Sequence, residues 1–210
     1  MAFGLKVVIY LIAGYALFTG AIYLAQRRMM YFPCAHLPTP VEAGLGVAHT
    51  ITLHTRDGLE LIAWHIPPKA GGANLTVVYL HGNGGNIAGR VHRARPLVAN
   101  GYGLLMVEYR GYGGNPGNPT EQGLYADARA GLDFLRSEGV SADQIGLLGE
   151  SLGSGVAVQM AAELGRAGTP AAGLILEAPY TSTTDVAATA YWFLPVRWMM
   201  KDRFDSLAKI

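Results

Sequence analysis

The stretch Gly149-Glu-Ser-Leu-Gly-Ser-Gly155 follows an apolar run and precedes a segment with helical periodicity. A G-x-S-x-G pattern in that position predicts a sharp strand-to-helix turn with Ser151 at its apex. Such a turn strains its central residue and leaves no room for side chains two positions away, which explains the flanking glycines. We predict that Ser151 is a nucleophile and that the N–H of Leu152 faces a developing oxyanion. The alternative is a glycine-rich turn with an incidental serine.

Strand and helix patterns alternate around this turn, which is typical of a layered α/β domain. Four continuous apolar runs predict strands buried on both faces: 75–80, 104–109, 145–148 and 174–176. We also expect a hairpin around residues 56–58 and helices over 120–139 and 152–165. The expected fold is therefore α/β, with a mostly parallel sheet and helices on both faces.

The loop His81-Gly-Asn-Gly-Gly-Asn86 directly follows the first of these runs. A flexible turn at the end of a strand can present a second backbone N–H to an oxyanion, and Asn83 is best placed to do so. His81 has two interpretations, a general base or a side chain that orients the loop by hydrogen bonding. The order expected after such a serine, an acid and then a histidine, favours the second.

No histidine follows Ser151 in the sequence. The six histidines are His36, His49, His54, His65, His81 and His92. Three aspartates, at positions 185, 202 and 205, follow the serine, but they precede the strand expected to present an acid. Glu177 is expected to order the turn at Pro179. We therefore assign neither the acid nor the base of a triad within these 210 residues.

Five motifs in the sequence resemble those of the α/β-hydrolase superfamily. Together they resemble the Bem46/ABHD13-like family of membrane-anchored, serine-aminopeptidase-like serine hydrolases. They lie at residues 81–86, 108–113, 149–155, 177–182 and 201–206. The resemblance covers about residues 31–210 and implies an α/β-hydrolase fold with Ser151 as nucleophile and Asn83 and Leu152 as oxyanion donors. In that family a further strand, an acid and a histidine follow. The resemblance thus predicts a C-terminally truncated chain whose domain, 49–210, lacks its last strands and helices.

The segment 7–25 is apolar and uncharged, and as a helix it would be about 28 Å long, close to the ~30 Å hydrocarbon core of a bilayer. We expect residues 1–28 to be a single-pass membrane anchor and residues 29–48 to be a linker. The alternative is a cleaved signal peptide, whose apolar part is usually shorter. Lys6 on one side and two arginines, at 27 and 28, on the other leave the orientation open.

A net charge of +1 gives no electrostatic case for a nucleic-acid partner. The sequence has one cysteine, no Cys/His cluster at metal-ligand spacing, and no lysine of the phosphate-loop type after a glycine cluster, so no metal or organic cofactor is expected. The expected partners are a membrane, through residues 7–25, and a small-molecule, acyl or peptidyl substrate.

Two functions from different classes fit these features. One is a serine hydrolase for ester, thioester or amide bonds, whose acid and histidine lie outside these residues. The other is a noncatalytic, membrane-tethered α/β-hydrolase-like binding module. The aromatic and methionine-rich segment 191–200 is either an acyl-binding lip over the active site or a surface that packs against further protein. If the strand order of the resembling family holds, the run 174–176 lacks one neighbouring strand and is expected at an apolar sheet edge.

Overall fold

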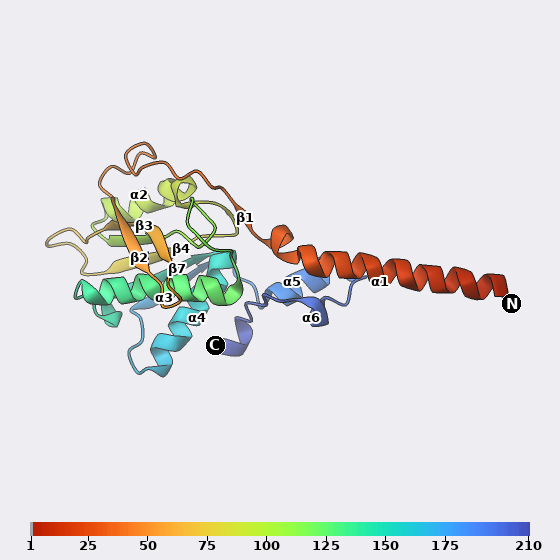
Figure 1. The fold of residues 1–210 in the computed structure, drawn as a ribbon. Helices are drawn as coiled ribbons and strands as arrows, with labels where there is room; N and C mark the ends of the chain where they lie inside the picture. The colour runs from red at the N-terminus through yellow and green to blue at the C-terminus, as the bar shows by residue number, and fades with distance from the viewer. Residues whose placement is uncertain (1) are drawn as a thin grey trace.

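The computed structural model describes residues 2–210 and is built around a six-stranded sheet in the order β2-β3-β6-β4-β7-β8 (Figure 1). The strands are β2 His49–His54, β3 Glu60–Ile66, β4 Thr76–Leu80, β6 Gly103–Val107, β7 Ile145–Glu150 and β8 Gly173–Glu177. The predicted hairpin is β2 with β3, and β3 is also antiparallel to β6. The four apolar runs are the strands of the parallel part, β6, β4, β7 and β8. The predicted α/β fold is confirmed.

Helices cover both faces of the sheet because successive strand residues point to opposite sides. In β4, Val78 and Leu80 belong to the core under α3 and α4, whereas Val77 and Tyr79 belong to the core under α2. The helices over the sheet are α2 Val91–Ala99, α3 Glu121–Ser137 and α4 Leu152–Arg166, and short 3₁₀ turns are η1 Ile87–Arg90, η2 Ala142–Gln144 and η3 Leu207–Lys209. Thr120, the first residue of the predicted helix 120–139, is the N-cap of α3, and its side chain accepts the N–H of Gly123.

α1, Ala2–Met30, extends away from the sheet as one long helix (Figure 1). Within Phe3–Met30, an 18-residue window has a mean hydropathy of 2.0, and none of that window is buried. Length and composition suit a membrane span, and a signal sequence near the N-terminus would have the same character.

The segment predicted to be a linker packs against the domain. β1, Phe32–Pro33, pairs in parallel with β5, Gly84–Gly85, which lies in the loop after β4. Tyr31 and Leu45 are buried in the two cores. Because only Tyr31 separates α1 from β1, the end of α1 is held directly against the loop after β4.

Residues 183–200, here called the cap, lie beside the half of α1 that is nearest to the sheet (Figure 1). The cap contains α5, Thr183–Ala190, and α6, Val196–Met199. It follows β8, which is an edge strand, and Leu174 and Ile175 of that strand are exposed. The expectation of an apolar sheet edge therefore agrees with the structure.

Candidate active site

Ser151 joins β7 to α4 and has a backbone conformation that non-glycine residues rarely adopt, with φ 48° and ψ −115°. Its N–H donates to the carbonyl of Glu177 at 2.8 Å. Its own carbonyl accepts from the N–H of Ser154 at 2.8 Å and from the hydroxyl of Ser154 at 2.6 Å. The surrounding bonds thus hold the strained conformation, which is typical of residues at functional sites.

The glycines at 149 and 153 are required by close backbone approach. A Cβ on residue 149 would lie 2.5 Å from the carbonyl oxygen of Gly153. A Cβ on residue 153 would collide with the carbonyl oxygen of Leu80 and lie 2.6 Å from that of His81. The start of α4 can therefore sit directly against the end of β4, which brings the loop after β4 next to the serine.

Leu152 and Asn83 line the same pocket as the serine, and neither of their N–H groups donates a hydrogen bond within residues 2–210. Asn83 is fixed in place by three other bonds. Its Nδ2 donates to the carbonyl of Met30 at 2.9 Å, and its carbonyl accepts from the N–H of Phe32 at 2.9 Å and the hydroxyl of Tyr112 at 2.8 Å. Leu152 begins α4, so the helix dipole favours negative charge beside it. Two fixed donors can stabilise an oxyanion here.

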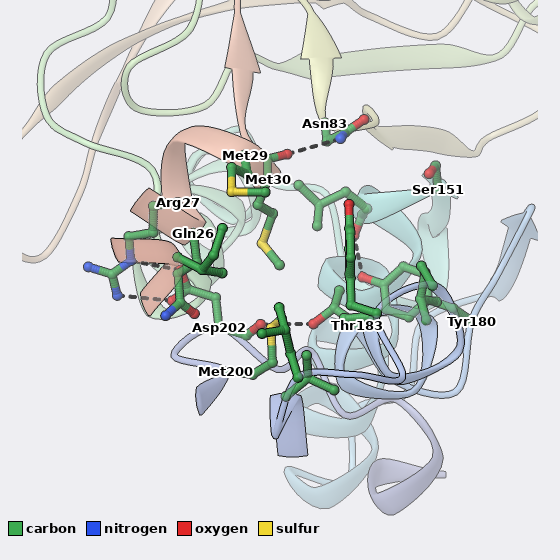
Figure 2. Close-up of a pocket in the computed structure, with 18 of the residues that line it drawn as sticks. Gln26, Arg27, Met29, Met30, Asn83, Ser151, Tyr180, Thr183, Met200 and Asp202 are labelled. Carbon is green, nitrogen blue, oxygen red and sulfur yellow. Dashed lines mark hydrogen bonds and ion pairs between the residues drawn. The ribbon is translucent and has the colours of Figure 1, made fainter. Parts of the chain in front are cut away.

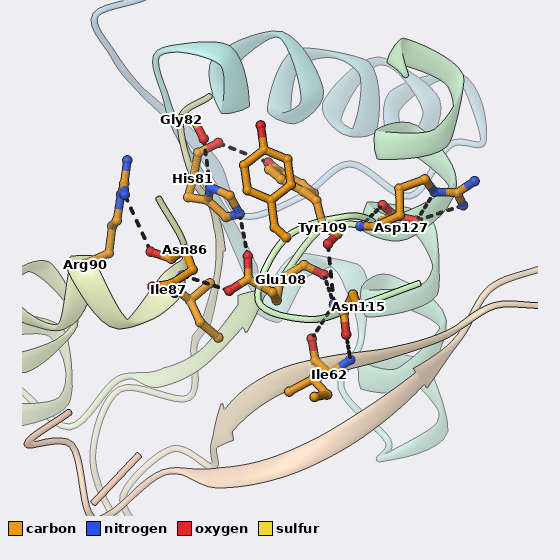
Figure 3. A network of polar contacts seen from close by, with 12 residues as sticks. Ile62, His81, Gly82, Asn86, Ile87, Arg90, Glu108, Tyr109, Asn115 and Asp127 are labelled. Atoms are coloured by element: carbon orange, nitrogen blue, oxygen red, sulfur yellow. Dashed lines mark hydrogen bonds and ion pairs between the residues drawn. The ribbon is translucent and has the colours of Figure 1, made fainter. Parts of the chain in front are cut away.

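His81 is fully buried and belongs to a polar network behind the loop (Figure 3). Its Nε2 lies 3.1 Å from Oε1 of Glu108, and its Nδ1 lies 2.7 Å from the carbonyl oxygen of Gly82. The other carboxylate oxygen of Glu108 accepts the N–H of Ile87 at 2.9 Å. The ring packs on Tyr109, with centroids 4.3 Å apart. Because both ring nitrogens already face oxygen atoms, the contacts favour the loop-orienting role of His81 over that of a base.

Glu177, which we predicted to order the turn at Pro179, has a different role. Its carboxylate pairs with Arg93 of α2, and its backbone carbonyl accepts the N–H of Ser151. It therefore supports the serine through the backbone, from the neighbouring strand β8.

Glu150, the residue before the serine, has a carboxylate that accepts hydrogen bonds from Tyr79 and Arg90. Burial by itself raises the pKa of Glu150, but the bonds from Tyr79 and Arg90 outweigh this effect and hold the pKa below its ordinary value. The ionised carboxylate is thus the form that the fold stabilises.

This depressed pKa predicts acid sensitivity. A carboxylate whose pKa is lower in the folded chain contributes stability above its ordinary pKa, about 4.3 for glutamate, and loses that contribution as the pH falls. From neutral pH to about pH 3, the urea midpoint of the native chain should therefore fall further than that of Glu150→Gln, which lacks the ionised group. An equal fall in the urea midpoints of the two proteins would contradict the depressed pKa of Glu150.

An apolar pocket of about 420 Å³ opens beside the serine (Figure 2). Ser151 and Asn83 lie at one end of it, and the rest of its wall is mainly apolar side chains of α1 and the cap. These include Phe18, Ile22, Met30, Val186, Ala190 and Leu194. The contribution of α1 is the feature of the site that we did not predict.

No histidine lines this pocket within the described residues. Asp202 lines it, but its carboxylate accepts two bonds from Arg27, at 2.8 and 3.1 Å, and the N–H of Glu121 at 3.1 Å. Asp185 pairs with Arg197 at 3.2 Å. Both carboxylates are therefore paired with arginines, and in residues 2–210 the structure brings neither a base nor a free acid to the serine.

Comparisons with known proteins agree with this geometry. The family model for the S33 serine aminopeptidases, a hydrolase family, matches residues 71–208. An uncharacterized protein of Mycobacterium tuberculosis (strain H37Rv) is 38% identical over 190 residues, which are 90% of this chain and 66% of that protein. The lysophosphatidylserine lipase ABHD12 of Danio rerio is 28% identical over 197 residues, 85% of this chain and 51% of that protein. The chain thus spans between half and two-thirds of the length of these curated relatives.

Solved structures lead to the same fold. An alpha-beta hydrolase from Vibrio vulnificus matches with a TM-score of 0.65 and 27% identity, over 81% of this chain and 61% of that one. An esterase from Pyrococcus furiosus, at 21% identity, matches with a TM-score of 0.61 over 81% of this chain and 65% of that one. The region matched by the family model contains the loop after β4, the turn at Ser151 and the cap. This chain belongs to the S33 serine aminopeptidase family of α/β hydrolases.

Proposed function

We propose that the protein is a serine hydrolase in which Ser151 is the nucleophile and the N–H groups of Asn83 and Leu152 form the oxyanion hole. The observation that carries the proposal is the positive φ of Ser151, held by its neighbours, beside two N–H groups that have no acceptor within residues 2–210. A turn with no chemical role has no reason to retain a strained serine at one end of an apolar pocket.

In the proposed reaction, the Oγ of Ser151 attacks the carbonyl carbon of an ester, thioester or amide, and its proton passes to a base. The carbonyl oxygen becomes an oxyanion and accepts hydrogen bonds from the two N–H groups. The bond to the leaving group then breaks, the leaving group takes up the proton, and water releases the acyl group from the serine.

We further propose that the base is a histidine, oriented by an acid, outside residues 1–210. The support is twofold: the described pocket contains no histidine, and the chain spans only part of the length of its relatives. Without its base the serine is an ordinary alcohol, and two backbone donors alone leave only residual catalysis.

The shape of the pocket favours a substrate with an apolar acyl group. Its volume, about 420 Å³, falls in the range of small-molecule sites, and its wall is mainly hydrocarbon. The name of one relative, lysophosphatidylserine lipase, is consistent with an acyl ester as substrate.

We also propose that α1 is a membrane anchor, with basic residues at both of its ends and an exposed apolar surface between them.

Labelling with a fluorophosphonate probe tests the nucleophile. The 210-residue chain should label weakly, and the chain extended by the coding sequence that follows residue 210 should label strongly. Ser151→Ala should abolish labelling of both. Ser137→Ala, at an exposed serine on α3, is the matched control and should leave labelling unchanged.

Two outcomes would overturn the proposal. If the extended protein does not label, or labels equally after Ser151→Ala, the nucleophile assignment is wrong. If a stop codon directly follows codon 210, the base does not come from a further segment of this chain. The second result, together with no labelling, would favour the noncatalytic binding module.

A further inference from the structure

The cap presents an aromatic surface that no described part of the chain covers. Trp192 and Trp198 are 83% and 88% exposed, and Tyr191 and Phe193 are nearly half exposed. Tryptophan and phenylalanine side chains are large, so their exposure to water carries a substantial hydrophobic cost. Phe193 packs edge-on against both Tyr191 and Trp192, and a group of neighbouring exposed aromatic side chains of this kind marks an interaction site.

Hydrogen bonds to α1 place this surface along the helix. The hydroxyl of Tyr15 donates to the carbonyl of Phe193 at 2.8 Å, so the tip of the cap lies level with Tyr15. At the other end, Nε2 of Gln26 donates to the carbonyl of Met199 at 3.1 Å. The contacts therefore extend along roughly 11 residues of α1, or about 16 Å of helix.

We propose that the cap is immersed in the lipid bilayer beside α1, so that its aromatic surface contacts lipid. We identify lipid as what covers this surface because the tip of the cap is bonded to the middle of α1, an apolar helix whose remaining surface is exposed. A bilayer that surrounds α1 at this level necessarily reaches the tip as well. This inference rests on the proposed membrane anchor.

The lengths fit this placement. Amphipathic elements enter the acyl boundary by about 5–10 Å. With the tip about 10 Å deep, the boundary lies near Ile22, and residues 3–22 then span about 30 Å, the thickness of the hydrocarbon core. Lys6 extends toward the far interface, and Arg27 lies in the headgroup region.

The polar groups of the cap also fit. Arg197 and Asp185 pair with each other at 3.2 Å, and Arg197 lies on α6, the helix whose last residue is bonded to Gln26. That end of the cap is therefore in the headgroup region, where charges stay solvated and Trp198 is an interfacial aromatic. At the tip, the carbonyl of Phe193 is satisfied by Tyr15, as a backbone group near hydrocarbon must be.

The placement has a consequence for access to the serine. The wall that α1 contributes to the pocket includes Phe18 and Ile22, and the wall that the cap contributes includes Val186 and Leu194. In this placement Phe18 and Leu194 lie at the level of lipid and Ile22 lies at its boundary, so the pocket borders the bilayer. An acyl ester could then reach Ser151 without leaving the membrane for water.

Tryptophan fluorescence tests the immersion, because the chain has three tryptophans and the third, Trp64, is 1% exposed in the core. The full chain is reconstituted in phosphatidylcholine vesicles with or without bromine on the lipid acyl chains. In Trp198→Phe the emission of Trp192 should be mostly lost to bromolipid, and in Trp192→Phe that of Trp198 should fall less, because it lies nearer the headgroups. The double variant, which keeps only Trp64, should lose almost none of its emission to bromolipid. Its emission also reports whether the core around Trp64 is folded.

Emission of Trp192 and Trp198 that is unchanged by bromolipid would overturn the inference, and so would failure of the chain to sediment with vesicles. Quenching of both residues by aqueous iodide instead would show that the cap faces water. Protection from both quenchers would show that protein covers it, either a second copy or another segment. Ser151→Ala should be quenched like the native chain, so failed labelling and failed immersion can be told apart.

Discussion

Gly153→Ala is expected to prevent the chain from folding stably. The added Cβ would overlap the carbonyl oxygen of Leu80 and lie 2.6 Å from that of His81. Both atoms belong to the backbone at the end of β4, a fully buried strand in the middle of the sheet, so neither can move without breaking pairing on both of its sides. We expect a loss of more than about 4 kcal/mol in the free energy of unfolding, measured by urea denaturation in detergent.

Gly165→Ala is the matched control, because Gly165 is also on α4 but nothing lies within 4 Å of a Cβ there. Alanine in an exposed helical position should be neutral or stabilise the chain by up to about 1 kcal/mol. If Gly153→Ala unfolds at the same urea concentration as Gly165→Ala, then α4 does not pack on β4 as described.

Glu108→Ala should have the second largest effect on stability, a loss of about 3 kcal/mol or more in the free energy of unfolding. Glu108 is fully buried, and its removal leaves the N–H of Ile87 without its acceptor, takes away the carboxylate oxygen 3.1 Å from Nε2 of His81, and creates a cavity. Since these groups hold both ends of the loop that contains Asn83, fluorophosphonate labelling of the extended protein should also fall. The two measurements are the urea midpoint and the rate of labelling.

Two variants separate the buried contacts from a general effect of charge. Glu108→Gln retains the shape and one acceptor oxygen, so it should recover part of the stability and of the labelling rate. Glu138→Ala, at an exposed glutamate after α3, should change the free energy of unfolding by less than about 0.5 kcal/mol. Equal losses in Glu108→Ala and Glu138→Ala would rule out the described role of the network.

The parallel strands were predictable because their signal is local. Each is a short apolar run between helical segments, and a strand buried on both faces has no need of polar alternation. The boundaries differ by a few residues: the run 104–109 ends as a strand at Val107, because Glu108 turns to His81 and Ile87. The run contains one charged residue, Glu108, but nothing in the sequence identified its partners.

The walls of the pocket could not be predicted in the same way. Phe18 and Val186 line one cavity although they are far apart in the chain. α1 is apolar on all sides, so no periodic stripe distinguished the side that faces the cap. The linker was likewise unpredictable, because β1 contributes only two residues and pairs with a loop.

The sequence by itself determined the strained turn at Ser151, since a hydroxyl residue between glycines two positions away is a local requirement of backbone geometry. It also determined an apolar helix long enough to span a bilayer. Only the tertiary structure decided that this helix and the cap enclose the space beside the serine. That arrangement depends on hydrogen bonds and packing between segments distant in the chain, which short-range patterns do not record.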